Sequence, residues 1–242
     1  MKILSLFSGA GIGDYYLSKY HEVLAANELD PRRAKLYSYL KPSTKMFEGN
    51  IQNQNLKKNI FQEINSIDMI IATPPCQGVS SLGSNKVQNN FIKDPRNFLI
   101  FELFDFLDFY NPNFVLIENT ERFSNMYFPF NGNLQKLYDI LIFKYSKKYE
   151  VHHDLLNCQD FGIPQSRPRS IFRLFKKGLC WHLPKKEKKI SLKDTIFHLP
   201  SLNPNEGSDI KWHYAKNHKL SVVECLRYTP EGKSALENLI YY

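Results

Sequence analysis

The sequence predicts an α/β fold built on a doubly wound, mostly parallel sheet, and two observations support this prediction. Strand-like segments alternate with segments of helical apolar spacing along much of the chain. The strand-like segments are also continuous apolar runs, which are typical of parallel strands covered on both faces. Because ligands of such sheets bind at the carboxyl ends of the strands, the residues that follow each expected strand are the candidates for a functional site.

Each expected element has a local signal in the sequence. Residues 3–7 form an apolar β-type run, and residues 14–19 are expected to be helical. A second strand is expected at residues 23–26. Pro31 suits the first turn of a helix whose apolar spacing continues to Pro42.

The middle of the chain continues this alternation. Residues 69–72 form a buried-type strand that two prolines end, and residues 98–110 form a strongly apolar helix. A further buried strand is expected at residues 114–117, followed by a helix near residues 133–145.

The pattern weakens beyond about residue 175, where basic runs and four prolines divide the sequence into short pieces. We therefore expect a main domain over residues 1–175 and an irregular extension over residues 176–242.

The composition favours a polyanionic partner. The 242 residues carry a formal net charge of +8 at pH 7, which makes nucleic acid one candidate. No apolar run approaches the roughly 18–20 residues of a membrane span, and the N-terminus lacks the pattern of a signal peptide, so we expect a soluble intracellular protein. The four cysteines form no C-x-x-C pair, and we expect no metal site.

The first two strand ends favour an adenosine-type cofactor. Gly9 and Gly11 allow the backbone to bend sharply and approach a ligand closely. Glu28 ends the second strand about 20 residues later, where a carboxylate suits ribose hydroxyls. The simpler interpretations stay open at this point: an ordinary turn, and a surface carboxylate near the start of a helix.

Cys76 follows Pro74 and Pro75 at the end of another strand. The prolines hold the backbone extended and present the thiol at the edge of the sheet. A thiolate in such a position can act as a nucleophile. By residue type alone, an inert buried cysteine is the more common case. The small, polar residues 78–85 have the composition of a loop that closes over a substrate.

Two later segments carry ionisable groups. Glu118, after a buried strand, can deliver a proton to a ring nitrogen, although helix capping is the simpler interpretation. Arg167 and Arg169 lie on one face if their segment is extended, as Pro168 favours. Such a pair suits a phosphate and a base carbonyl, and a basic edge strand is the alternative.

In this order the segments resemble seven motifs of the DNA cytosine-5 methyltransferase family, over roughly residues 1–175. The matching segments are Phe7–Gly11, Glu28, Gly49–Ile51, Pro74–Gln77, Asp94–Leu99, Glu118–Thr120 and Asn157–Arg169. The Pro-Cys-Gln of the fourth segment matches the catalytic motif of the family closely.

The resemblance implies a Rossmann-like fold that binds S-adenosylmethionine, and thereby a catalytic and cofactor-binding methyltransferase domain over residues 1–175. Glu28 is expected to hold the ribose of the donor, and Leu29 and Ile51 to flank its adenine. Asn50 stands where the family usually has an aspartate. The full set of expected cofactor-binding residues is Phe7, Gly9, Gly11, Glu28, Leu29, Asn50, Ile51, Pro74 and Leu99.

The resemblance also implies a mechanism. The Cys76 thiolate attacks carbon 6 of a cytosine flipped out of duplex DNA, and carbon 5 takes the methyl group. Glu118 stabilises the proton on ring nitrogen 3. Arg169 contacts the carbonyl oxygen of the base, and Arg167 a backbone phosphate. A base then removes the carbon 5 proton, and Cys76 leaves.

Family members continue into a target-recognition region and a tenth motif, which this sequence lacks. We therefore expect one subunit of a split restriction-modification methyltransferase, whose second polypeptide supplies both and covers exposed apolar residues. A truncated gene is the alternative. Two further hypotheses are methylation of cytosine in transfer RNA and a catalytically silent DNA-binding or regulatory subunit. We expect a bacterial cytoplasmic location with activity at the nucleoid.

Overall fold

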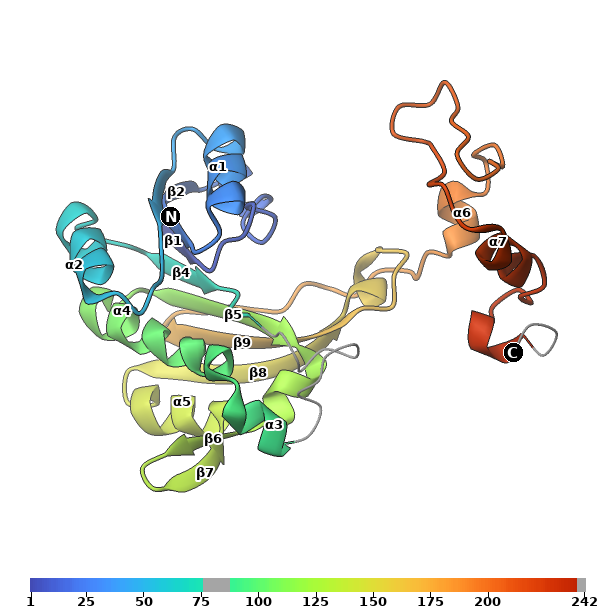
Figure 1. Cartoon of the computed structure of the whole chain (residues 1–242). Coiled ribbons are helices and arrows are strands. Elements are labelled where there is room, and N and C mark those ends of the chain that lie inside the picture. Colours follow the sequence, from blue (N-terminus) through green and yellow to red (C-terminus); the bar gives the residue numbers. More distant parts are fainter. Residues whose placement is uncertain (76–87, 239–242) are drawn as a thin grey trace. The chain divides into compact units, whose positions relative to one another are not determined.

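The computed structural model describes residues 1–75 and 88–238 (Figure 1). Its main sheet has seven strands in the order β3-β2-β1-β4-β5-β9-β8. The first five are parallel, and β9 runs antiparallel between β5 and β8. The prediction of a doubly wound, mostly parallel sheet is thereby confirmed. The strands are β1 (Lys2–Leu6), β2 (Glu22–Glu28), β3 (Lys45–Glu48), β4 (Met69–Ala72), β5 (Phe114–Thr120), β8 (Tyr149–Asn157) and β9 (Pro168–Lys176).

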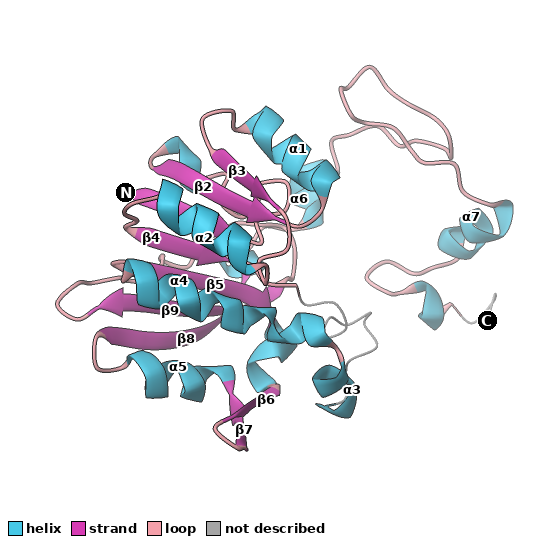
Figure 2. Cartoon of the chain, turned by 60° about the vertical axis from the view of Figure 1, so that its left-hand side comes forward, coloured by secondary structure: helices cyan, strands magenta, loops and turns pink. Residues whose placement is uncertain are grey.

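Three helices, α2, α4 and α5, lie over one face of this sheet (Figure 2). They share one large apolar core with the side chains that β1, β4, β5 and β9 direct toward that face. A smaller core on the other face contains Ile3, Val23, Met69 and Ile71. The helices of this part are α1 (Pro31–Leu40), α2 (Gln54–Glu63), α3 (Gln88–Lys93), α4 (Glu102–Tyr110) and α5 (Leu137–Tyr145).

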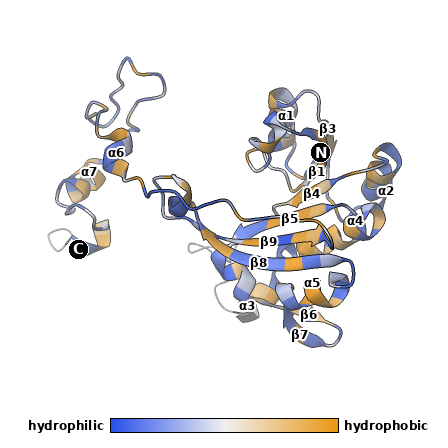
Figure 3. Ribbon diagram, turned by 180° about the vertical axis from the view of Figure 1, so that it is seen from behind, coloured by the Kyte–Doolittle hydropathy of each residue, from blue (hydrophilic) through white to orange (hydrophobic). Residues whose placement is uncertain are grey.

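Burial on both faces accounts for the continuous apolar runs of the central strands. All four residues of β4 are buried, and β4 and β5 are largely apolar in Figure 3, whereas the outer strand β8 carries more polar residues. The short elements are η1 (Leu17–Lys19), η2 (Pro95–Phe101), η3 (Glu121–Asn125), η4 (Cys158–Phe161) and a hairpin of β6 (Tyr127–Phe130) and β7 (Asn133–Lys136).

Three expected helices differ from the structure. The helix expected at 14–19 is reduced to turns and η1, because the Asp14 side chain is buried and bound to Tyr37 of α1 and to Lys41, which directly follows α1. The helix expected at 98–110 begins as the 3-10 helix η2 and becomes α-helical only at Glu102. Residues 133–136 belong to β7, since they pair with β6, and the helix begins at Leu137.

The chain divides into two compact units, Met1–Lys189 and Ile190–Tyr242. The expected boundary at residue 175 lies inside the first unit. The second unit contains α6 (Leu192–Ile196), α7 (Leu220–Arg227) and η5 (Ala235–Glu237). Its described residues contribute to neither apolar core. Over residues 1–75 and 88–238, no helix is long and apolar enough to pass through a membrane.

Candidate active site

The loop after β1 approaches the end of β2 through the carboxylate of Glu28. The backbone N–H of Gly9 donates to Glu28 Oε2 over 2.8 Å, and the N–H of Asp30 donates to Oε1 over 2.9 Å. Both Phe7 and Gly9 have positive φ angles of 57°. A non-glycine residue such as Phe7 adopts this conformation at a cost of about 1–3 kcal/mol, which the surrounding structure must offset. The strained turn brings the backbone of Gly9 close to the acid.

A first cavity of about 330 Å³ opens at these strand ends. It is lined by Phe7, Gly9, Asn27, Glu28, Leu29, Asp30, Arg33, Gly49, Asn50, Ile51, Thr73, Pro75, Arg96 and Leu99. Seven of the nine expected cofactor-binding residues are in this lining; the exceptions are Gly11 and Pro74. The carboxyl ends of β1, β2, β3 and β4 therefore surround one cavity, as expected for a parallel sheet.

Gly11 and Pro74 are buried and do not line the first cavity. Gly11 has a φ of +84°, and a Cβ atom there would lie 2.9 Å from the ring of Tyr37. The glycine therefore permits both the turn and its close packing on α1. Pro74 is buried, and its carbonyl oxygen accepts a hydrogen bond of 3.1 Å from the side chain of Asn119.

A buried polar cluster attaches the glycine loop to α1. The Asp14 carboxylate accepts a 2.8 Å hydrogen bond from the Tyr37 hydroxyl and forms an ion pair with Lys41. Asp14 is 1% exposed and Lys41 is 8% exposed. Burial and the nearby Asp14 carboxylate both raise the pKa of Tyr37, so the phenol stays protonated and donates.

A second cavity of about 580 Å³ adjoins the first, and the two share Phe7, Gly9 and Thr73 in their linings. The described residues that line it are Phe7, Ser8, Gly9, Ala10, Ile12, Gly13, Ile71, Thr73, Leu116, Glu118, Leu156, Cys158, Phe161, Arg167, Arg169, Ile171 and Pro184. Three of the four residues expected to contact a nucleotide, Glu118, Arg167 and Arg169, are among them. Most of the rest are apolar, as suits the flat face of a base.

Glu118 and Arg169 form an ion pair of 2.8 Å in the second cavity. Their strands β5 and β9 are antiparallel, and Arg169 lies opposite Thr120, two residues from Glu118 on the same face. A long side chain can span the distance between such diagonal neighbours on adjacent strands. The Arg169 guanidinium also donates to the carbonyl of Pro168 over 2.8 Å. The Arg169 guanidinium is thus held by the Glu118 carboxylate and by the Pro168 carbonyl.

Arg167 precedes β9 and is positioned through its backbone. Its N–H donates to Asn157 Oδ1 over 2.8 Å, and the same oxygen accepts from the N–H of Gln159 over 3.3 Å. The end of β8 therefore fixes the start of β9 beside the second cavity. No hydrogen bond or ion pair to the Arg167 guanidinium is observed in the described parts of the chain.

Cys76 lies outside the described residues, but the residues that precede it are well fixed. The Thr73 hydroxyl donates to the carbonyl of Phe7 over 2.9 Å. Asn119, which is 1% exposed, donates to the carbonyl of Pro74. Pro75 lines the first cavity, and Thr73 lines both. The last described residues before Cys76 therefore lie at the boundary between the two cavities.

Several residues of the site were missed by sequence reasoning. Arg33 and Arg96 line the first cavity, and Asp14, Tyr37 and Lys41 support its glycine loop. Arg96 had a signal, because it belongs to the Asp-Pro-Arg segment. The ion pair of Asp14 with Lys41 spans 27 positions and has no local signal. Within residues 1–75 and 88–238, no three His, Cys, Asp or Glu side chains are grouped to hold a metal ion.

The sheet order and the cavity at its strand ends define the Rossmann-like class of S-adenosylmethionine-dependent methyltransferases. The chain belongs to the C-5 cytosine-specific DNA methylase family, whose sequence profile matches residues 1–238. The predicted family, class of enzyme and methyl donor are thereby confirmed.

Named relatives agree with this family. The chain is 39% identical to the type II methyltransferase M1.HgaI of Avibacterium volantium, over 99% of this chain and 68% of that protein. It is 30% identical to M1.HphI of Haemophilus parahaemolyticus, over 95% of this chain and 61% of that protein. It is 28% identical to M.AquIA of a Picosynechococcus strain, over 76% of this chain and 75% of that protein. The chain thus spans about two thirds of the first two relatives, whereas M.AquIA is of similar length.

Solved structures show the same fold. A DNA modification methyltransferase encoded within an E. coli prophage superposes with a TM-score of 0.63 at 22% identity, over 98% of this chain and 67% of that one. A DNMT2 variant of Spodoptera frugiperda superposes with a TM-score of 0.52 at 27% identity, over 78% of this chain and 54% of that one.

Proposed function

We propose that this chain transfers a methyl group from S-adenosylmethionine to carbon 5 of cytosine in duplex DNA, within a restriction-modification system. The observation that carries the proposal is the pair of adjoining cavities. One is lined by residues suited to an adenosine group, and the other contains Glu118 with both arginines. They meet at Phe7, Gly9 and Thr73, beside the segment that leads into Cys76.

The residues of the first cavity fit the donor. The Glu28 carboxylate suits ribose hydroxyls, and its buried oxygens already accept two backbone N–H groups. Leu29, Ile51 and Leu99 offer apolar contact to adenine, and the Asn50 amide offers a hydrogen bond to the adenine amino group. When bound there, the donor supplies an electrophilic methyl group on its sulfonium.

In the second cavity, the chain's own groups activate the pyrimidine. The Cys76 thiolate forms a bond to carbon 6, and the electron pair of the 5,6 double bond moves to carbon 5. Glu118 holds a proton on ring nitrogen 3, while Arg169 contacts the carbonyl oxygen. After carbon 5 has taken the methyl group, a base removes its proton. The carbon–sulfur bond then breaks, and the double bond re-forms.

Arg167 is suited to a different part of the substrate. Its guanidinium borders the second cavity without an observed protein partner in the described residues, and its backbone is fixed by Asn157. A backbone phosphate beside a flipped nucleotide would satisfy it. The net charge of +8 favours the same polyanion, so the activity would be exercised on nucleoid DNA.

We further propose that a second polypeptide completes the enzyme by supplying target recognition and the tenth motif. The described residues after Lys189 expose many large apolar side chains: Ile190, Leu192, Ile196, Phe197, Ile210, Trp212, Tyr214, Leu220, Val222, Leu226, Tyr228 and Leu236. Such exposure is typical of a surface that another chain covers.

A trapping experiment tests the proposed chemistry. Duplex DNA that contains 5-fluorocytosine is expected to form a covalent adduct with the chain, in the presence of S-adenosylmethionine and any partner polypeptide that the reaction needs. The fluorine cannot leave as a proton does, so the thiol stays attached. Cys76→Ser is expected to form no adduct and to lose methyl transfer, whereas Cys225→Ser, a substitution in the second unit, retains both.

The outcome separates the rival hypotheses. Methyl transfer that survives Cys76→Ser would refute the proposed nucleophile. Labelling of transfer RNA in preference to duplex DNA would instead favour the RNA substrate. A chain that binds the donor and DNA but forms no adduct would be the catalytically silent subunit.

A further inference from the structure

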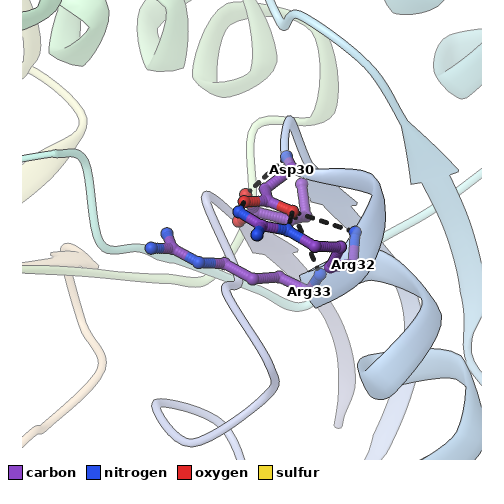
Figure 4. A network of polar contacts seen from close by, with 4 residues as sticks. Asp30, Arg32 and Arg33 are labelled. Carbon is purple, nitrogen blue, oxygen red and sulfur yellow. Dashed lines mark hydrogen bonds and ion pairs between the residues drawn. The ribbon is translucent and has the colours of Figure 1, made fainter.

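Two consecutive arginines at the start of α1 differ in what their guanidinium groups contact. The Arg32 guanidinium binds the Asp30 carboxylate, with Nε 3.3 Å from Oδ1 and Nη2 3.0 Å from Oδ2. Arg33 offers Asp30 only its backbone N–H, over 3.4 Å. Figure 4 shows the Arg33 side chain extending away from that carboxylate. In the described parts of the chain, no partner of the Arg33 guanidinium is observed.

The two arginines also differ in their relation to the first cavity. Arg33 is in its lining together with Leu29, Asn50 and Ile51, and Arg32 is not. The Arg32 side chain is 91% exposed and neutralised by Asp30. Arg32 is therefore paired with Asp30, whereas its neighbour Arg33 lines the first cavity.

The other guanidinium in this lining belongs to Arg96, and a carboxylate already engages it. Arg96 Nε lies 2.9 Å from Asp94 Oδ1, and Nη2 lies 2.7 Å from Oδ2. A bidentate pair of this kind fixes the orientation of both groups. Arg33 is consequently the more available of the two to a ligand.

A planar guanidinium without a carboxylate partner binds well to the face of a flat aromatic ring. Leu29 and Ile51 line the same cavity and suit the same ring by apolar contact. Resting on the proposed function, we infer that Arg33 is a further donor-binding residue, which covers the adenine of S-adenosylmethionine. The carboxylate of the donor's amino-acid end is a different target, and the experiment distinguishes the two.

The test compares two ligands by isothermal titration calorimetry on the whole chain. S-adenosylhomocysteine has both the adenosine and the amino-acid end, whereas 5′-methylthioadenosine lacks the amino-acid end. Arg33→Ala is expected to weaken the binding of both by the same factor, roughly three- to tenfold. Arg33→Lys keeps the charge but loses the planar group, and is expected to recover only part of the affinity.

Arg32→Ala is the matched control, because it removes the same side chain one residue away and outside the cavity. It is expected to leave both affinities unchanged. The inference is overturned if Arg33→Ala binds 5′-methylthioadenosine like the wild type, or if Arg32→Ala loses as much affinity. If the wild type binds neither ligand, the proposed donor site itself is refuted. Both arginines are exposed, and thermal unfolding verifies that the variants fold.

Discussion

At the scale of single residues, the second cavity combines groups that lie far apart in the sequence. Glu118 comes from β5 and Arg169 from β9, and their ion pair follows from the antiparallel register of these strands. The Glu118 side chain is 34% exposed and that of Arg169 is 18% exposed, so a substrate can reach both. The pair thus holds an acid and a hydrogen-bond donor toward the same space before any substrate binds.

Glu118→Gln is expected to lower the rate of methyl transfer by about 10²–10⁴, because the amide cannot hold the proton on the ring nitrogen. Donor affinity is expected to stay unchanged, since Glu118 lines the second cavity and not the first. Single-turnover assays and calorimetry with S-adenosylhomocysteine measure the two quantities. Glu121→Gln, an exposed change three residues away, is the control, and an equal loss of rate there would contradict the assignment.

At the scale of elements, the glycine loop and α1 form one structural unit. The loop depends on α1 in two ways: Gly11 packs against the Tyr37 ring, and Asp14 binds both Tyr37 and Lys41. A buried ion pair contributes little net stability when intact, but removal of one partner leaves an uncompensated charge. The cluster therefore matters chiefly for fixing the loop that shapes the first cavity.

Asp14→Asn is expected to destabilise the chain by about 3–5 kcal/mol, because the buried Lys41 ammonium loses its counter-charge. Tyr37→Phe keeps the ion pair and the ring, and is expected to cost about 1.5–3 kcal/mol for one hydrogen bond to a charged group. Urea unfolding of both variants measures the difference. A midpoint of Asp14→Asn equal to that of the wild type would show that the pair does not hold the loop.

At the scale of the whole molecule, the two compact units differ in how their apolar residues are used. Both apolar cores and the described linings of both cavities belong to the first unit. The second unit has short helices and exposed apolar side chains. Donor binding and catalysis are therefore expected of the first unit, and contact with another chain of the second.

The chain alone is expected to bind S-adenosylhomocysteine but to methylate duplex DNA only when the second polypeptide is added. Filter assays with labelled donor, on the chain with and without the second polypeptide, measure this. The mixture that contains Cys76→Ser is the control for methylation by the partner. Full sequence-specific methylation by the chain alone would contradict the split enzyme.

The sequence predicts most of the fold and half of the first cavity's described lining, because its signals are local. Continuous apolar runs predict strands buried on both faces, and β4 is buried throughout, whereas β5 alternates between buried and half-buried residues. Local signals fail where pairing decides, as in residues 133–136, which become a strand by pairing with β6. They fail also at residues 14–19, where the Asp14 side chain is bound by α1 instead of supporting a helix of its own.

The amino-acid sequence by itself determined the fold class, the family and which strand ends carry the candidate site residues, since these depend on periodicity and on short contiguous motifs. Only the tertiary structure decided that Gly11 serves packing on Tyr37, that Glu118 pairs with Arg169, and that Arg33 faces the cavity while Arg32 does not. The physical reason is that such contacts depend on strand register and on side-chain direction, and neighbouring residues of one type can meet different partners.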